Sequence, residues 1–146
     1  MNILAFPGQG SQKIGMGKIF YENFDAAKGV FEEVDDTLNF KLSKLIFDGD
    51  ISELSLTSNT QPALMAVSIA ILRVFLDEYK ININQRFKFV CGHSLGELTA
   101  LCAANVLSLK DTANLLKIRG QSMQEAVPHG EGSMAALISS DFSKLD

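Results

Sequence analysis

Apolar side chains recur along the chain at two spacings, and these spacings predict its strands and helices. Short apolar runs at residues 2–6, 87–91 and 133–139 predict three strands, the first of them buried. Residues 18–39 instead carry apolar side chains at alternating steps of three and four, which predicts one amphipathic helix with an aromatic stripe facing the core. Strands separated by helical segments favour parallel pairing, so the pattern predicts an α/β fold.

Four further helices follow from the same reading. Residues 41–47 predict a short helix that ends at an Asp-Gly-Asp sequence, and residues 98–104 predict another. The segment from 62 to about 79 is apolar nearly all round until Arg73, which predicts a buried helix. Residues 57–60 offer N-caps for it, and Pro62 suits its first turn. Ser108 and Asp111 resemble a capping box that opens a helix through about residue 126.

Composition and charge narrow the class of protein. The length of 146 residues fits one ordinary domain, and a net charge of −4 without a basic run argues against nucleic-acid binding. The amino terminus lacks a signal-peptide pattern, and the longest apolar stretch, residues 62–76, is too short to span a membrane. Cys91 and Cys102 both lie in apolar runs, so we expect buried thiols in a reducing cytoplasm and no metal site.

The strongest chemical signal is the sequence Gly-His-Ser-Leu-Gly-Glu at residues 92–97. Gly92 and Gly96 flank Ser94 at two residues on either side, between a predicted strand and a predicted helix, which is the pattern of a nucleophile elbow. Such a turn exposes the serine hydroxyl above a helix N-terminus, where an oxyanion can form. The alternative interpretation is a glycine-rich turn with an incidental serine. The context favours Ser94 as a nucleophile.

A glycine-rich loop follows the first strand, with four glycines in residues 8–17. Lys13 stands where a dinucleotide fingerprint needs glycine, so a Rossmann cofactor site is rejected. The loop either lets backbone approach a ligand closely or simply connects a strand to a helix. Neither histidine is a convincing base for Ser94. Adjacent residues at such a turn generally point different ways, which argues against His93, and His129 is best read as a surface loop residue.

Five motifs stand in one order and spacing: residues 6–12 (FPGQGSQ), 60–63 (TQPA), 92–97 (GHSLGE), 118–120 (IRG) and 123–126 (MQEA). Together they resemble the malonyl-CoA:acyl carrier protein transacylases, the acyltransferase family of fatty acid and polyketide synthesis, over essentially the whole chain. The resemblance implies a partial α/β-hydrolase-like large domain with a parallel sheet. Residues 1–127 would form its N-terminal part with the elbow, and residues 128–146 the start of a small ferredoxin-like insert.

The resemblance also implies a ping-pong reaction. Ser94 would accept a malonyl group from malonyl-CoA as an ester, and the phosphopantetheine thiol of acyl carrier protein would then take it. Gln9 and the backbone N–H of Leu95 would form the oxyanion hole, and no further cofactor or metal is implied. Placing donors where charge develops contributes about 3–4 kcal/mol per donor in comparable sites.

The resemblance assigns the acyl group's free carboxylate to Arg119, since guanidinium grips a carboxylate bidentately. Without the family, Arg119 reads equally well as a solvated cation on a helix face. The other implied pocket residues are Gln61, His93 and Met123. From the residues alone, Gln61 is better interpreted as a capping amide.

The family's catalytic histidine lies in the second half of proteins about twice this length, and no residue here occupies its place. Three hypotheses follow. The chain is an N-terminal portion that becomes active with a separate C-terminal half, or an inactive fragment or pseudogene product, or a serine esterase; Gln9 and Arg119 in register argue against the third. We expect the 146-residue chain alone to lack transfer activity and to be only marginally folded.

Overall fold

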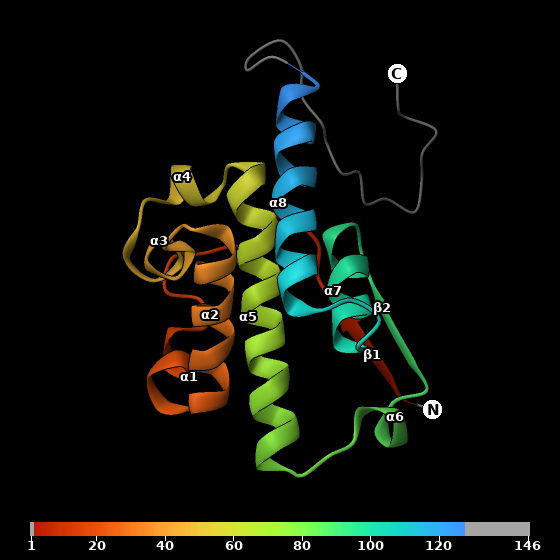
Figure 1. Ribbon diagram of the computed structural model, residues 1–146. Coiled ribbons are helices and arrows are strands. Elements are labelled where there is room, and N and C mark those ends of the chain that lie inside the picture. Colours follow the sequence, from red (N-terminus) through yellow and green to blue (C-terminus); the bar gives the residue numbers. More distant parts are fainter. Residues whose placement is uncertain (1, 128–146) are drawn as a thin grey trace, which may run out of the picture.

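The computed structural model describes residues 2–127, and its central element is the long helix α5 (Thr57–Glu78). Figure 1 shows α2 (Asp25–Leu38) and α8 (Leu109–Glu125) beside α5, and these two helices also contact each other. Helix α7 (Leu95–Ala103) packs on both α5 and α8, with the strands next to it. The remaining elements are β1 (Ile3–Phe6), α1 (Lys18–Asn23), α3 (Leu42–Asp48), α4 (Ile51–Leu54), α6 (Ile83–Arg86) and β2 (Phe89–Gly92).

The two strands form a parallel pair, which confirms the predicted α/β class. Ile3 is opposite Phe89 and Phe6 is opposite Gly92. Parallel pairing brings the carboxyl ends of both strands to the same edge of the sheet. The glycine-rich loop after β1 and the turn after β2 therefore start side by side. The third predicted strand, at 133–139, and the predicted second unit, 128–146, lie outside the described residues.

Burial of the strands is less complete than the apolar runs predict. In β1 only Phe6 is buried, and Ile3 is 51% exposed. In β2 Phe89 is 57% exposed. Helix α7 packs against both strands, but residues 2–127 place no second layer over the exposed side chains. The prediction of a buried first strand is therefore wrong for most of β1 and holds only at Phe6.

An apolar groove of about 530 Å³ runs between the sheet and α5. We call it the β1–α5 groove; its walls include Leu4 and Phe6 of β1, Leu64, Ile71 and Phe75 of α5, and Phe87. Ile71 and Phe75 are 38% and 41% exposed. The groove is therefore an apolar surface that the described residues leave open.

Helix α5 forms the core as predicted, but it is longer than its apolar stretch. It is the one helix among residues 2–127 that is long and apolar enough to cross a membrane by length and composition. However, 72% of its most apolar window is buried inside the protein, as in the core helix of a soluble domain. Length alone was thus the wrong argument against a membrane span; burial is the relevant observation.

The start of α5 differs from the prediction. The helix begins at Thr57, so Pro62 is its sixth residue and lies beyond the first turn, and the N-cap is Leu56. The polar side chains expected to cap the helix instead donate hydrogen bonds to backbone carbonyls of α4, which precedes it in the sequence. Asn59 Nδ2 donates to the carbonyl of Glu53 at 3.0 Å, and Thr60 Oγ1 donates to the carbonyl of Leu54 at 2.6 Å. These bonds satisfy buried polar atoms and attach α5 to α4.

The helix predicted at 18–39 is divided in two at Phe24, whose backbone is extended (φ −136°, ψ 119°). Its apolar stripe is nevertheless in the core, since Ala27, Phe31 and Val34 are buried. Two short helices, α4 and α6, escaped prediction. Each is capped by a side chain at its start, because Asp50 and Asn82 accept hydrogen bonds from backbone N–H groups two residues ahead.

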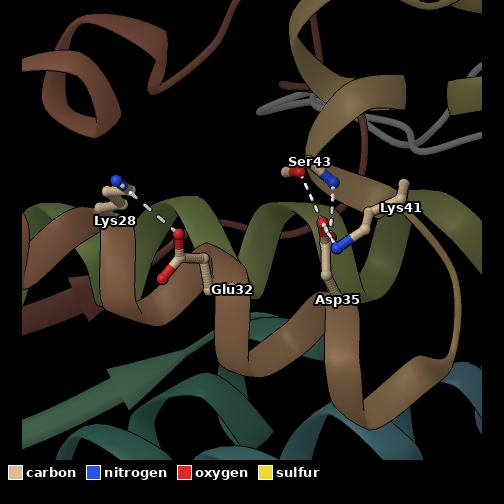
Figure 2. Close-up of polar contacts among 5 residues, drawn as sticks. All are labelled: Lys28, Glu32, Asp35, Lys41 and Ser43. Atoms are coloured by element: carbon tan, nitrogen blue, oxygen red, sulfur yellow. Dashed lines mark hydrogen bonds and ion pairs between the residues drawn. The ribbon is translucent and has the colours of Figure 1, made fainter.

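A buried carboxylate joins α2 to α3 (Figure 2). Asp35 is 4% exposed and accepts hydrogen bonds from the backbone N–H and the hydroxyl of Ser43, at 2.8 and 2.7 Å. Lys41 Nζ lies 3.6 Å from the same carboxylate, whereas Lys28 and Glu32 form a longer, exposed pair at 3.9 Å. Exposed pairs stabilise little, so the Asp35 contacts are the ones that hold this corner of the fold.

The predicted start of α8 is confirmed, because Ser108 Oγ accepts a hydrogen bond from the backbone N–H of Asp111 at 3.0 Å. The prediction for the cysteines holds in part. Cys102 is buried in α7, and burial raises the pKa of its thiol. Cys91 is exposed, because it lies on the side of β2 that residues 2–127 leave uncovered.

Candidate active site

Ser94 lies at a turn with the predicted strand–turn–helix geometry. Its φ of +56° and ψ of −112° are strained for a residue other than glycine. A methyl group at Gly92 would overlap the backbone of Gly96, and one at Gly96 would lie 2.5 Å from the carbonyl oxygen of Phe6. Both glycines are therefore required by close approach, and the turn presents an exposed serine.

The first turn of α7 supplies backbone donors beside Ser94. The N–H of Gly96 donates to the carbonyl of His93 at 2.9 Å, and that of Glu97 donates to the carbonyl of Ser94 at 3.1 Å. Leu95 is the first residue of α7, and the first N–H of a helix has no acceptor within it. Its amide is thus suited to stabilise an anion at the serine, and its role in an oxyanion hole stays a prediction.

Arg119 of α8 brings three elements together at this serine. Its Nη2 donates to Ser94 Oγ at 3.0 Å, and its Nη1 donates to Gln61 Oε1 of α5 at 2.7 Å. Arg119 is partly buried. The interpretation of Arg119 as a solvated cation is therefore wrong: its guanidinium is directed at the elbow.

Close packing of α8 on α5 makes this contact possible. At Gly120, a Cβ would lie 2.6 Å from both Ser58 Cα and the carbonyl oxygen of Thr57. The residue that follows Arg119 must therefore lack a side chain for the helices to approach. With the backbones this close, the arginine side chain contacts both Gln61 of α5 and Ser94 of the elbow.

Gln61 is not the capping amide that the residues alone favoured. It is 1% exposed, and its Oε1 accepts from Arg119 while its Nε2 donates to the sulfur of Met123 at 3.3 Å. Met123 lies one turn after Arg119 on α8 and is 38% exposed. The structure therefore brings together Ser94, Arg119, Gln61 and Met123.

The two remaining predicted residues lie on the glycine-rich side of the site. Gln9 is exposed, and its Nε2 donates to Thr57 Oγ1 at 3.5 Å at the start of α5. The imidazole of His93 packs against Gly8. The contact of Gln9 with Thr57 was not predicted, because Thr57 was interpreted as one of several possible helix caps.

A second cation–amide contact joins α8 to α5 and was also missed. Lys117 Nζ donates to Asn59 Oδ1 at 3.0 Å and lies 5.5 Å from the centroid of the Phe40 ring. Burial lowers the pKa of Lys117. Residues two apart on a helix do not share a face, so the sequence offered no signal for this contact.

His129 lies outside the described residues, so the structure does not test it as a base. Residues 2–127 contain no group of three or more His, Cys, Asp or Glu side chains that could hold a metal ion. The chemistry that the described site supports is that of an exposed serine beside backbone donors and a guanidinium.

Two solved structures with the same arrangement of elements are named as malonyltransferases or malonyl-transacylases. An acyl-carrier-protein S-malonyltransferase from Bartonella henselae matches with a TM-score of 0.84 and 58% identity, over 88% of this chain and 41% of that chain. A malonyl-transacylase solved in complex with its type II polyketide acyl-carrier protein matches with a TM-score of 0.81 and 41% identity, over 88% and 40%.

A curated relative from Bacillus subtilis (strain 168), named malonyl CoA-acyl carrier protein transacylase, is 54% identical over 140 residues. The match spans 96% of this chain and 43% of the relative, so the chain covers less than half of that protein's length. Residues 4–144 match the sequence pattern of the acyl transferase domain. This chain therefore belongs to the acyl transferase domain family.

Proposed function

We propose that this chain carries the acyl-accepting part of a malonyl-CoA:acyl carrier protein transacylase. The observation that supports this best is the 3.0 Å hydrogen bond from Arg119 Nη2 to Ser94 Oγ. A malonyl group has one methylene between its thioester carbonyl and its free carboxylate. A guanidinium beside the nucleophile can therefore bind that carboxylate while the serine attacks the carbonyl.

In the proposed first half-reaction, Ser94 Oγ attacks the thioester carbon and loses its proton to a base. The backbone N–H of Leu95 and the side-chain amide of Gln9 stabilise the tetrahedral oxyanion. The carbon–sulfur bond then breaks, and coenzyme A leaves as the thiol with the transferred proton. The product is a malonyl ester on Ser94.

In the second half-reaction, the phosphopantetheine thiol of acyl carrier protein attacks this ester. The carbon–oxygen bond breaks, and the proton of the thiol returns to Ser94 Oγ through the same base. The structure solved with a carrier protein bound to its own malonyl-transacylase supports this choice of partner. We place the reaction in cytoplasmic fatty acid synthesis, without a cofactor beyond the two substrates.

The base in this scheme is a histidine from the part of the family's fold that the chain does not span. General-base help is usually worth about 10²–10⁴ in rate. An inactive fragment is the alternative, and it would form no malonyl adduct on Ser94. A serine esterase fits less well, because a neutral acyl group would leave the partly buried Arg119 cation unpaired.

The test is mass spectrometry of the natural protein that contains this chain, after incubation with malonyl-CoA. We expect a malonyl adduct on the peptide with Ser94, none in Ser94→Ala, and an unchanged adduct in the control Ser55→Ala, which removes an exposed hydroxyl at the end of α4. An undiminished adduct in Ser94→Ala would refute the proposal. A wild-type protein without any adduct would favour the inactive fragment.

A further inference from the structure

We infer that Gln61 is a positioning residue: it orients the Arg119 guanidinium toward the acyl carboxylate and does not itself bind substrate. This inference rests on the proposed function. It differs from the role that the family resemblance implies for Gln61, which is to line the pocket near the ester.

Both ends of the Gln61 amide are already used by protein groups. A guanidinium only donates hydrogen bonds, so the amide atom that faces Arg119 Nη1 at 2.7 Å has to be the oxygen. The Nε2 atom then points the other way and donates to Met123 Sδ at 3.3 Å. With Gln61 only 1% exposed, little of its amide is left for a ligand.

The two hydrogen bonds of the Arg119 guanidinium have different fates during the proposed reaction. The bond from Nη2 goes to the Ser94 hydroxyl, which changes when the serine is acylated. The bond from Nη1 goes to Gln61, which takes no part in the chemistry. A long arginine side chain loses rotamer freedom when it binds a ligand, and a standing contact removes part of that cost beforehand. Gln61 thus holds the Arg119 guanidinium in position while the contact with Ser94 changes.

The neighbouring Asn59–Lys117 contact offers a control that distinguishes a positioning role of Gln61 from a contribution to helix packing alone. Asn59 is also buried on α5, and it also accepts a hydrogen bond from a cation of α8, at 3.0 Å. Lys117 makes no described contact with Ser94, whereas Arg119 does. Loss of the Asn59 contact should therefore affect stability alone, which makes Asn59 a matched control.

The experiment measures kcat and KM for malonyl-CoA and acetyl-CoA in the natural protein that contains this chain. Gln61→Met keeps the side-chain volume and removes the acceptor. We expect kcat/KM for malonyl-CoA to fall about tenfold or more, mainly through KM, because a hydrogen bond to a charged group is lost. The value for acetyl-CoA, which has no carboxylate, should change by less than about twofold.

Two further variants complete the test. Asn59→Leu should lower the melting temperature while leaving the malonyl-to-acetyl ratio unchanged. Gln61→Glu keeps a hydrogen-bond acceptor for Nη1, but its carboxylate forms an ion pair with the Arg119 guanidinium and competes with the malonyl carboxylate. Malonyl transfer should therefore fall while the protein stays folded. Gln61→Met should cause no further change in the ratio when Arg119 is already alanine.

Equal losses for the two thioesters in Gln61→Met, or a fall in the ratio in Asn59→Leu, would overturn the inference. Arg119→Ala separates this failure from that of the proposed function. If Arg119→Ala lowers the malonyl-to-acetyl ratio and Gln61→Met does not, only the positioning role is wrong. If Arg119→Ala leaves the ratio unchanged, the proposed carboxylate site is wrong.

Discussion

The site depends on a few side chains whose surroundings give them their roles. Ser94 is strained into a positive φ, and Arg119 is held between it and Gln61. Strain of this kind persists only where the surrounding packing determines the backbone. Here the close approach of Gly92 to Gly96, and of Gly96 to β1, provides that packing.

At the residue scale we predict that Arg119→Ala weakens malonyl transfer by about 2–5 kcal/mol, the cost of removing one partner of a desolvated charge pair. Arg119→Lys should recover only part of this loss, because an ammonium cannot grip a carboxylate bidentately. Acetyl transfer should change little. The measurement is kcat/KM for the two thioesters.

The control is Lys117→Ala, which removes another cation of α8 whose described contacts are Asn59 and Phe40. It should leave the malonyl-to-acetyl ratio unchanged. Equal losses for both thioesters in Arg119→Ala would mean that Arg119 supports the structure and does not select the substrate.

At the scale of elements, the site exists because α8 lies directly against α5. The helices approach at Gly120, and two amide–cation contacts join them. Helix α7 and the sheet place the elbow beside the part of this helix pair that carries Arg119 and Gln61. The packing of α8 on α5 therefore determines how far the Arg119 guanidinium lies from Ser94.

We predict that Gly120→Ala destabilises the protein by about 1–3 kcal/mol, as overpacking commonly does. The new Cβ would lie 2.6 Å from the α5 backbone, so α8 has to move away from α5 and carries Arg119 with it. The measurements are the free energy of unfolding and the malonyl-to-acetyl ratio, which should both fall.

Gly29→Ala is the matched control, because Gly29 lies in α2 with open space around its Cα. Alanine there should stabilise the helix by about 0.5–1 kcal/mol. If Gly120→Ala also stabilised the protein, helix propensity would outweigh packing, and the argument for close approach at Gly120 would fail.

At the scale of the whole molecule, the described residues cover α5 well on the α2 and α8 sides and poorly along the sheet. The β1–α5 groove lies on this less covered side of α5, whereas the exposed side chains of Ile3 and Phe89 alternate with Leu4 and lie on the opposite face of the sheet. Contiguous apolar surface of this kind marks an interaction site or a source of aggregation.

We predict that residues 1–146, prepared alone, bind an apolar fluorescent dye in the β1–α5 groove. Ile71→Ser should reduce dye binding, because Ile71 lines the groove. The control Ile19→Ser changes an isoleucine that is 68% exposed on α1, outside the groove, and should leave dye binding unchanged. Each change should alter stability by about 0.5 kcal/mol or less.

Dye fluorescence and a thermal melt measure this directly. A sharp cooperative melt without dye binding would contradict both this prediction and the expectation of marginal folding. Equal reductions in the two serine variants would place the dye elsewhere on the molecule.

Local patterns in the sequence determined a good part of this structure. The Gly-x-Ser-x-Gly spacing around Ser94 required a strand–turn–helix, and the Ser108 cap began α8, because steric and capping rules act over a few residues. Helical periodicity likewise placed the core face of α2, and the nearly all-apolar composition of α5 predicted its burial. The break at Phe24 and the early start of α5 were missed. At α5, the bonds of Asn59 and Thr60 to α4 stabilise the added first turn.

Only the tertiary structure decided which polar residues belong to one site. Gln61 and Arg119 are 58 residues apart in the sequence. Their local patterns favoured a capping amide for Gln61 and fitted a solvated cation as well as a site residue for Arg119. Their contact depends on how closely α8 approaches α5, which is set by packing at Gly120 and Ser58. Helix packing is a long-range property that periodicity does not encode, so the sequence named the residues through resemblance, and the fold showed which of them touch.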